Sequence, residues 1–150
     1  MKASLHLIVL LVLLMLSSST VQASGQIEVF SVNKGKVVKA VSTSQEIQRE
    51  VEEILHHITD IYREFEPIPN RGYMIKVPLD PAVPIKNKWV NQDVIQVILI
   101  FPEYENPHLM VFDSENRSYF FTFERSVNSF LTQIDFIPNK HRGNRNLFAY

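Results

Sequence analysis

Apolar residues recur at helical spacing between residues 43 and 65, and this is the clearest pattern in the chain. At 100° per residue they fall within an arc of about 120°, and charged residues take the rest of the circumference. They are Ile47, Val51, Ile54, Leu55, Ile58, Ile61, Tyr62 and Phe65. Ser42 and Thr43 each precede a Gln or Glu by three residues, which is the spacing of a capping box, and Pro67 ends the pattern. The segment 43–65 is therefore predicted to form one long amphipathic helix.

Alternation with a period of two predicts strands before and after this helix. Segments 26–32 and 36–41 flank the turn Asn33-Lys34-Gly35 and predict a hairpin. Further strands are predicted over 72–77, 94–101, 109–112 and 119–123, the last two joined by a turn at 113–118. The segment 79–91 contains prolines and no regular period, which predicts a long surface loop. Together these segments indicate an antiparallel sheet of about six strands.

A short helix is predicted near the C-terminus, where Ser126 can act as its N-cap. One side of it carries Val127, Phe130, Leu131 and Ile134. The whole pattern predicts a two-layer α+β domain over residues 24–137, with the long helix packed on one face of the sheet. We expect the short helix to cover part of the second face, because its apolar side needs a packing partner. Residues 138–150 are polar and basic, and we expect them to form a flexible tail.

Residues 1–23 have the three parts of a secretory signal peptide. Lys2 supplies the positive charge, the run 5–16 is apolar apart from His6, and small residues lead to Ala23. A helix that spans a membrane needs roughly 20 apolar residues, so this run is too short for an anchor. We therefore expect cleavage after Ala23, a secreted or extracytoplasmic protein, and no stable membrane insertion after cleavage.

Composition and charge exclude several classes of partner and site. The chain holds 15 Lys and Arg against 16 Asp and Glu, a formal net charge of -1, so it lacks the positive charge that attracts nucleic acid. It contains no cysteine, which excludes disulfides, thiolate metal sites and thiol nucleophiles. An exported domain without disulfides favours a bacterial source.

No motif predicts a catalytic, metal or cofactor site. His56 and His57 lie among acidic residues, but they point about 100° apart on the predicted helix and cannot converge on one metal ion. The motifs Gly-x-Ser-x-Gly and His-Glu-x-x-His are both absent. Acidic residues near predicted loops leave paired carboxylates, and hence a small secreted hydrolase, as an alternative. These residues are Asp80, Asp93, Glu103, Glu105, Asp113 and Glu115.

Aromatic and methionine side chains supply the candidate partner-binding surface. Alternation turns Phe120 away from Phe121 in one strand, and Met110 and Phe112 away from Val111 in the strand before it. If the short helix leaves this second face uncovered, Met110, Phe112 and Phe120 stay exposed for a partner. Trp89 joins the candidate surface because it follows two lysines, and an aromatic ring beside basic residues can stack on a sugar.

The sequence as a whole favours a secreted or envelope-associated binding or accessory protein over an enzyme. Its expected partner is an envelope protein, an extracellular protein or a glycan, and no cofactor is expected. Two alternatives stay open. One is the small hydrolase, and the other is an inhibitor or immunity-type protein whose loop 79–91 enters the cleft of its partner.

Overall fold

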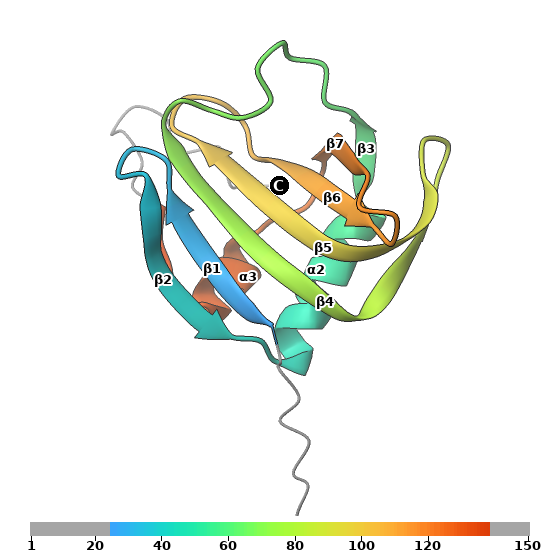
Figure 1. Cartoon of the computed structure of the whole chain (residues 1–150), viewed down its shortest axis with the longest axis horizontal. Coiled ribbons are helices and arrows are strands. Elements are labelled where there is room, and N and C mark those ends of the chain that lie inside the picture. Colours follow the sequence, from blue (N-terminus) through green and yellow to red (C-terminus); the bar gives the residue numbers. More distant parts are fainter. Residues whose placement is uncertain (1–24, 139–150) are drawn as a thin grey trace, which may run out of the picture.

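The computed structural model describes residues 25–138, and strands dominate this part of the chain (Figure 1). Its elements are β1 (Gln26–Ser31), β2 (Lys36–Ser42), α2 (Gln45–His56), β3 (Ile58–Ile61), β4 (Gly72–Lys86), β5 (Asn91–Pro102), β6 (His108–Asp113), β7 (Ser118–Phe123) and α3 (Asn128–Gln133). The strands form one antiparallel sheet in the order β2-β1-β4-β5-β6-β7-β3. The expected α+β class is confirmed, and the sheet has one more strand than the pattern indicated.

The prediction of one long helix over 43–65 is wrong, because α2 ends at His56 and the chain continues as β3. The start of α2 is close to the expected one: the Ser44 hydroxyl accepts a hydrogen bond from the Ile47 amide at 3.2 Å. Its predicted apolar stripe is buried as far as Leu55. After Leu55 the chain enters β3, whose β-branched residues favour a strand. Pairing of β3 with β7 also satisfies backbone groups of β7 that would otherwise form the unpaired edge of the sheet.

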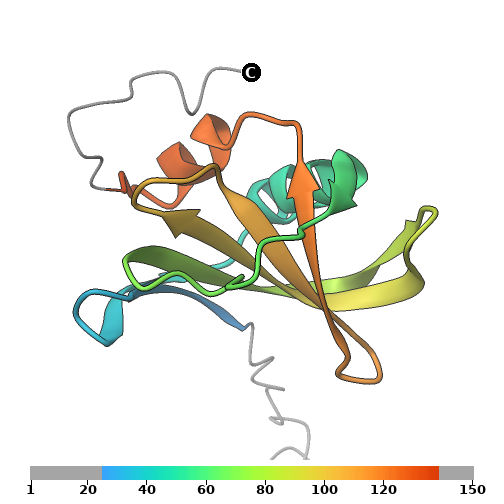
Figure 2. The ribbon, with the colours of Figure 1, turned by 90° about the horizontal axis from the view of Figure 1, so that it is seen from above.

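The predicted loop over 79–91 is also wrong, because β4 runs on to Lys86 and pairs with β5 almost to the hairpin turn. Val83 lies opposite Val94, and both are buried. Pro81 lies within the register shift between Pro78 and Val83, where a strand tolerates proline. Pro84 follows the shift in a part of β4 that pairs with β5 but not with β1, which is an edge position open to proline. The long hairpin curves toward the side of the sheet that carries the helices (Figure 2).

Both helices lie on the same face of the sheet (Figure 2), so the expectation that the short helix covers the second face is wrong. The predicted apolar side of α3 is buried, but it packs into the core that α2 also contacts. That core includes Ile54 and Phe130 from the helices and Val97, Leu99 and Phe121 from the strands. The two helices therefore share one layer, and no helix within residues 25–138 lies on the opposite face of the sheet.

The predicted signal peptide, residues 1–23, lies outside the described residues, as does all of the predicted tail except Pro138, which is buried. Neither described helix is long and apolar enough to cross a membrane.

Candidate functional site

The face of the sheet that carries no helix, called here the helix-free face, is defined by strand register. Successive residues of a strand point to opposite faces, and the buried core residues Ile75, Val97, Leu99 and Val111 point toward the helices. Their neighbours therefore form rows across the helix-free face. One row is Phe30, Met74, Ile100 and His108; the next is Glu28, Lys76, Ile98, Met110 and Phe120; the third is Pro78, Gln96, Phe112 and Ser118.

Three of the four candidate residues come together on this face. Met110 and Phe120 are paired directly between β6 and β7, and Phe112 lies in the next row. Both phenylalanines are half-buried, but Met110 is buried, with only 9% of its surface exposed, so the expectation that it stays exposed is wrong. The alternation of apolar residues in the last hairpin was thus sufficient to group these three side chains.

Trp89 is placed elsewhere. It lies in the turn between β4 and β5, where the Asn87 side chain accepts hydrogen bonds from the backbone N–H groups of Trp89 and Val90. The Trp89 ring packs against the core, with its centroid 6.1 Å from that of Phe121, and the Lys88 ammonium lies 4.2 Å from the Trp89 ring. Its ring therefore belongs to the helix side of the sheet and not to the helix-free face.

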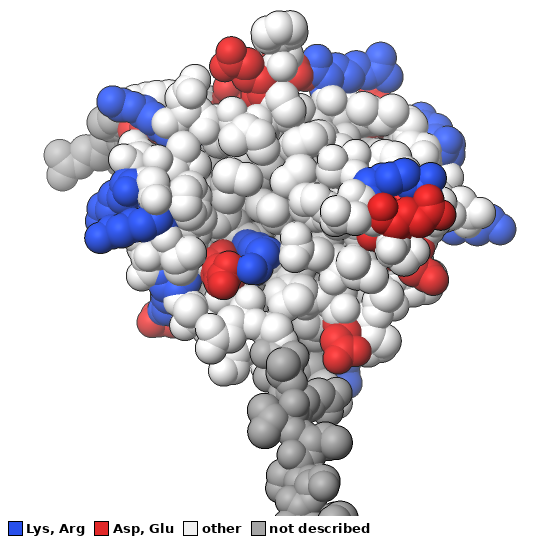
Figure 3. Space-filling model, viewed as in Figure 1, with Lys and Arg blue, Asp and Glu red and all other residues white. Residues whose placement is uncertain are grey.

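Residues of β1, β4 and β5 enlarge the helix-free face beyond what sequence reasoning proposed. Phe30, Met74 and Ile98 are half-buried on it. Lys76 and Glu28 form an ion pair of 2.6 Å within the second row, and each side chain is 38% exposed. Figure 3 shows that most atoms in the middle of this face belong to residues other than Lys, Arg, Asp and Glu. The face is therefore largely apolar, with one acid–base pair among the three rows.

The loop after β3 covers one end of the helix-free face. Tyr62 stacks on His108 with ring centroids 3.8 Å apart, and His108 Nε2 donates a hydrogen bond to the Pro67 carbonyl at 2.8 Å. Ile100 and His108 are consequently buried although they point to this face. Burial lowers the pKa of His108 and outweighs the backbone hydrogen bonds that favour its charged form. The open part of the face thus lies toward the second and third rows.

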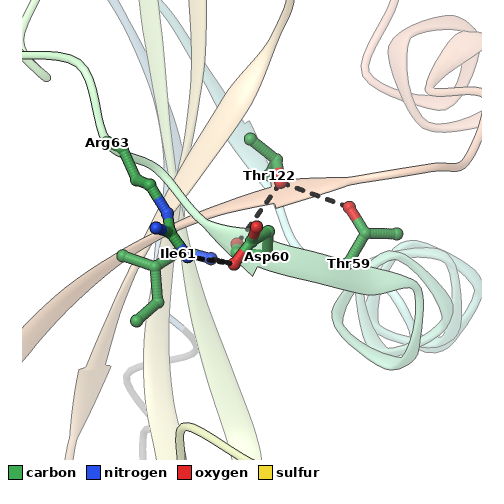
Figure 4. A network of polar contacts seen from close by, with 5 residues as sticks. All are labelled: Thr59, Asp60, Ile61, Arg63 and Thr122. Carbon is green, nitrogen blue, oxygen red and sulfur yellow. Dashed lines mark hydrogen bonds and ion pairs between the residues drawn. The ribbon is translucent and has the colours of Figure 1, made fainter.

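A polar network fastens β3 to β7 at the edge of the same face (Figure 4). The Asp60 carboxylate accepts a hydrogen bond from the Ile61 amide at 2.8 Å and pairs with Arg63 at 3.4 Å. Thr122 donates to the Asp60 carbonyl at 3.3 Å and lies 3.2 Å from the hydroxyl of Thr59. The bond from Ile61 contributes most to the lowered pKa of Asp60, and Arg63 lowers it further. This network holds an edge strand in place, which is a structural role.

A polar hollow of about 390 Å³ lies on the helix side, lined by Glu50, His57, Glu124, Arg125, Ser126 and Ser129. Arg125 bridges the carboxylates of Glu50 and Glu53 at 3.6 and 3.5 Å. His57 Nδ1 donates to the Glu53 carbonyl at 2.7 Å, whereas His56 lies 3.6 Å from Glu52, so the two histidines diverge. Arg125 thus holds the Glu50 carboxylate of this hollow in an ion pair.

Of the six acidic residues expected near loops, Asp80 lies in β4 and Asp93 in β5, Glu103 and Glu105 follow β5, and the remaining two lie at the end of β6 and after it. Asp113 and Glu115 share the β6–β7 turn, where the Asp113 carboxylate accepts hydrogen bonds from the Glu115 and Arg117 amides and pairs with the Arg117 side chain at 2.7 Å. Burial raises the pKa of Asp113, but the bonds from Arg117 outweigh it and the pKa is lowered. A carboxyl group held in this way is a poor general acid, and its hydrogen bonds shape the turn instead.

Metal binding finds no support in residues 25–138, where no three His, Cys, Asp or Glu side chains are grouped to hold an ion. No known protein family, curated protein or solved structure matches this chain.

Proposed function

We propose that this protein is a non-enzymatic binding or accessory protein, exported from the cell, that contacts its partner through the helix-free face. The observation that carries the proposal is a set of half-buried apolar side chains, among them Phe30, Ile98, Phe112 and Phe120, on a face that no helix within residues 25–138 covers. Soluble monomers rarely leave large contiguous apolar patches exposed unless the patch contacts something.

The chemistry of the face favours a protein partner over a glycan. Methionine and phenylalanine side chains adapt to the shape of an apolar partner and are common at protein interfaces. A glycan needs many polar contacts, whereas the three rows offer mainly the Glu28–Lys76 pair and Gln96. That ion pair supplies polar contacts that orient a partner on an otherwise apolar surface.

A retention experiment with matched isoleucine substitutions tests the proposal. Immobilised protein beginning at Ser24 is incubated with an envelope extract of the source cells, and retained proteins are identified by mass spectrometry. Ile98→Ser places a hydroxyl in the centre of the face, and we expect it to abolish retention. Ile137→Ser makes the same chemical change at a residue that is 88% exposed and lies after α3, and we expect retention to be unchanged.

Circular dichroism and urea unfolding establish that both variants fold. Phe120→Ser provides a second probe of the face at its β7 end. Retention that survives both Ile98→Ser and Phe120→Ser would show that the partner binds elsewhere.

A further inference from the structure

Two acidic-aromatic-acidic triplets meet at one end of the sheet. The first is Glu64-Phe65-Glu66 in the loop after β3, and the second is Glu103-Tyr104-Glu105 after β5. Residues of both loops line one hollow of about 230 Å³, which includes Glu66, Glu103, Tyr104 and Glu105. We call the six residues of the two triplets the acidic aromatic tip. Its two loops lie at the top and the upper left of Figure 1, and in Figure 3 the acidic atoms at the top lie beside both uncharged and basic atoms.

The aromatic side chains of the tip project into solvent. Phe65 is 97% exposed and Tyr104 is 67% exposed. Ile68, which lines the same hollow, is also among the exposed large apolar residues. A phenylalanine side chain this exposed contributes almost nothing to the stability of the fold, because the hydrophobic free energy is proportional to the apolar area removed from water.

The two loops are nevertheless fixed to each other. Tyr62 donates a hydrogen bond to the Glu105 carboxylate at 2.8 Å and stacks on His108. The Glu103 amide donates to the Arg71 carbonyl at 3.2 Å, and the Arg71 and Glu103 side chains pair at 3.8 Å. Prolines at 67 and 69 further restrict the first loop. A surface held in this way loses little conformational freedom when it binds.

The tip also carries negative charge, which is only partly compensated because Arg71, in the lining of the same hollow, pairs within the described chain with Glu103 alone. Over residues 25–138, no Lys, Arg or His forms an ion pair with Glu64, Glu66 or Glu105. Burial is the main cause that raises the pKa of the neighbouring Tyr62, and the hydrogen bond to Glu105 and the charges of Glu105 and Glu64 raise it further. The four carboxylates of the tip therefore outnumber the one described base that pairs with them, Arg71, and this excess of negative charge favours a cationic partner.

We propose that the acidic aromatic tip is a second binding surface, which takes a cationic segment of another polypeptide chain. A Lys or Arg side chain would lie over the ring of Phe65 or Tyr104 and between the carboxylates of the two triplets, gaining both a cation–π contact and ionic contacts. A bare metal ion fits less well because the described residues contain no group of three suitable ligands. An anionic lipid surface would repel the carboxylates that flank Phe65.

Peptide binding to the full mature chain at low salt tests this proposal. The probe is a fluorescein-labelled peptide of alternating Lys and Gly, and its binding is followed by fluorescence anisotropy. Replacing both Glu64 and Glu66 by Gln should weaken binding about three- to tenfold, because each exposed ionic contact contributes up to about 1 kcal/mol. Phe65→Ala and Tyr104→Ala should each weaken it about two- to fivefold through loss of the cation–π contact.

The matched control removes the same charge elsewhere. Glu46→Gln with Asp93→Asn neutralises two exposed carboxylates away from the tip, and we expect less than a twofold change from it. Equal weakening by the control pair, or equal binding of the same peptide with Glu in place of Lys, would overturn the proposal, as would no binding at all. Tighter binding after Lys140, Arg142 and Arg145 are replaced by Gln would also overturn it, because the chain's own C-terminal segment would then be the cation.

Discussion

The two faces of the sheet are built from the same strands but are covered differently. On β5, Val97 and Leu99 are buried beneath the helices, whereas Ile98 between them is half-buried on the helix-free face. On β6, Val111 is buried beneath the helices and its neighbour Phe112 is half-buried on the other side. Apolar composition is therefore similar on the two faces, and the position of α2 and α3 makes one of them a core and the other a surface.

This difference separates stability from recognition. Burial of apolar area contributes roughly 25 cal/mol per Å², so the helix side stabilises the fold. Apolar residues on the helix-free face are only partly buried in the folded chain. The rest of their hydrophobic free energy is gained only when another surface covers them. Substitutions on the two faces should accordingly differ in what they change.

The largest effect is expected at the centre of the covered face. Phe130 of α3 is fully buried in the core, and Phe130→Ala should reduce the free energy of unfolding by about 3–5 kcal/mol through lost burial and a residual cavity. Urea denaturation followed by circular dichroism measures this change. A loss below 1 kcal/mol would mean that α3 does not pack on the sheet in solution.

A smaller effect is expected on the helix-free face. Ile98→Ala should reduce the free energy of unfolding by about 1 kcal/mol, between the cost of a core truncation and that of a surface change. The same urea experiment measures it, and repeating it at several protein concentrations shows whether a second copy covers the face. If Ile98→Ala reduced the free energy of unfolding as much as Phe130→Ala does, at every protein concentration, Ile98 would lie in a core. The two faces would then not differ in how they are covered.

The pH dependence of stability tests the covered end of the helix-free face. Burial lowers the pKa of His108, so the neutral ring is favoured in the folded state. The stability that His108 contributes is present above its unfolded pKa of about 6.5 and is lost as the pH falls toward the lower pKa of the folded state. His108→Gln keeps an N–H donor for Pro67 without a titrating group, and it should flatten the stability profile between pH 7 and pH 5. An unchanged profile would assign the dependence to other groups.

The smallest effect concerns Trp89, the candidate residue that proved to lie on the helix side. Lys88→Ala removes the ammonium group beside its ring and should reduce the free energy of unfolding by less than about 1 kcal/mol. A double-mutant cycle with Trp89→Leu isolates the contact from the packing of the ring on Phe121. A coupling free energy of zero would leave Trp89 with a packing role alone.

Local sequence patterns predicted the beginning of α2, the first hairpin and the buried side of α3, because these features depend on residues that are close to each other in the sequence. They failed at β3, since Ile58 and Ile61 continue the helical spacing while the partner that makes them a strand, β7, is remote in sequence. They failed at 79–86 for the same reason: β5 supplies the pairing that compensates for the prolines.

The candidate surface shows the same limit. Alternation placed Met110, Phe112 and Phe120 on one face, but it could not add Phe30 or Met74, because strand order joins them only through β4 and β5. The tip was missed as well, although the repeated acidic-aromatic-acidic triplet was a visible signal. The sequence could not show that the two triplets are neighbours, because the loop before β4 and the loop after β5 are brought together only by the pairing of β4 with β5.

The pairing of β3 with β7 also has a consequence for the order of folding. Both outer strands, β2 and β3, come early in the chain, whereas Ile61 of β3 finds its partner only at Phe121. Contacts so distant in sequence form slowly, because a long loop must close first. The N-terminal half therefore cannot complete the sheet until β7, the last strand in the sequence, is available for pairing, and a chain truncated before Ser118 would leave β3 without its strand partner.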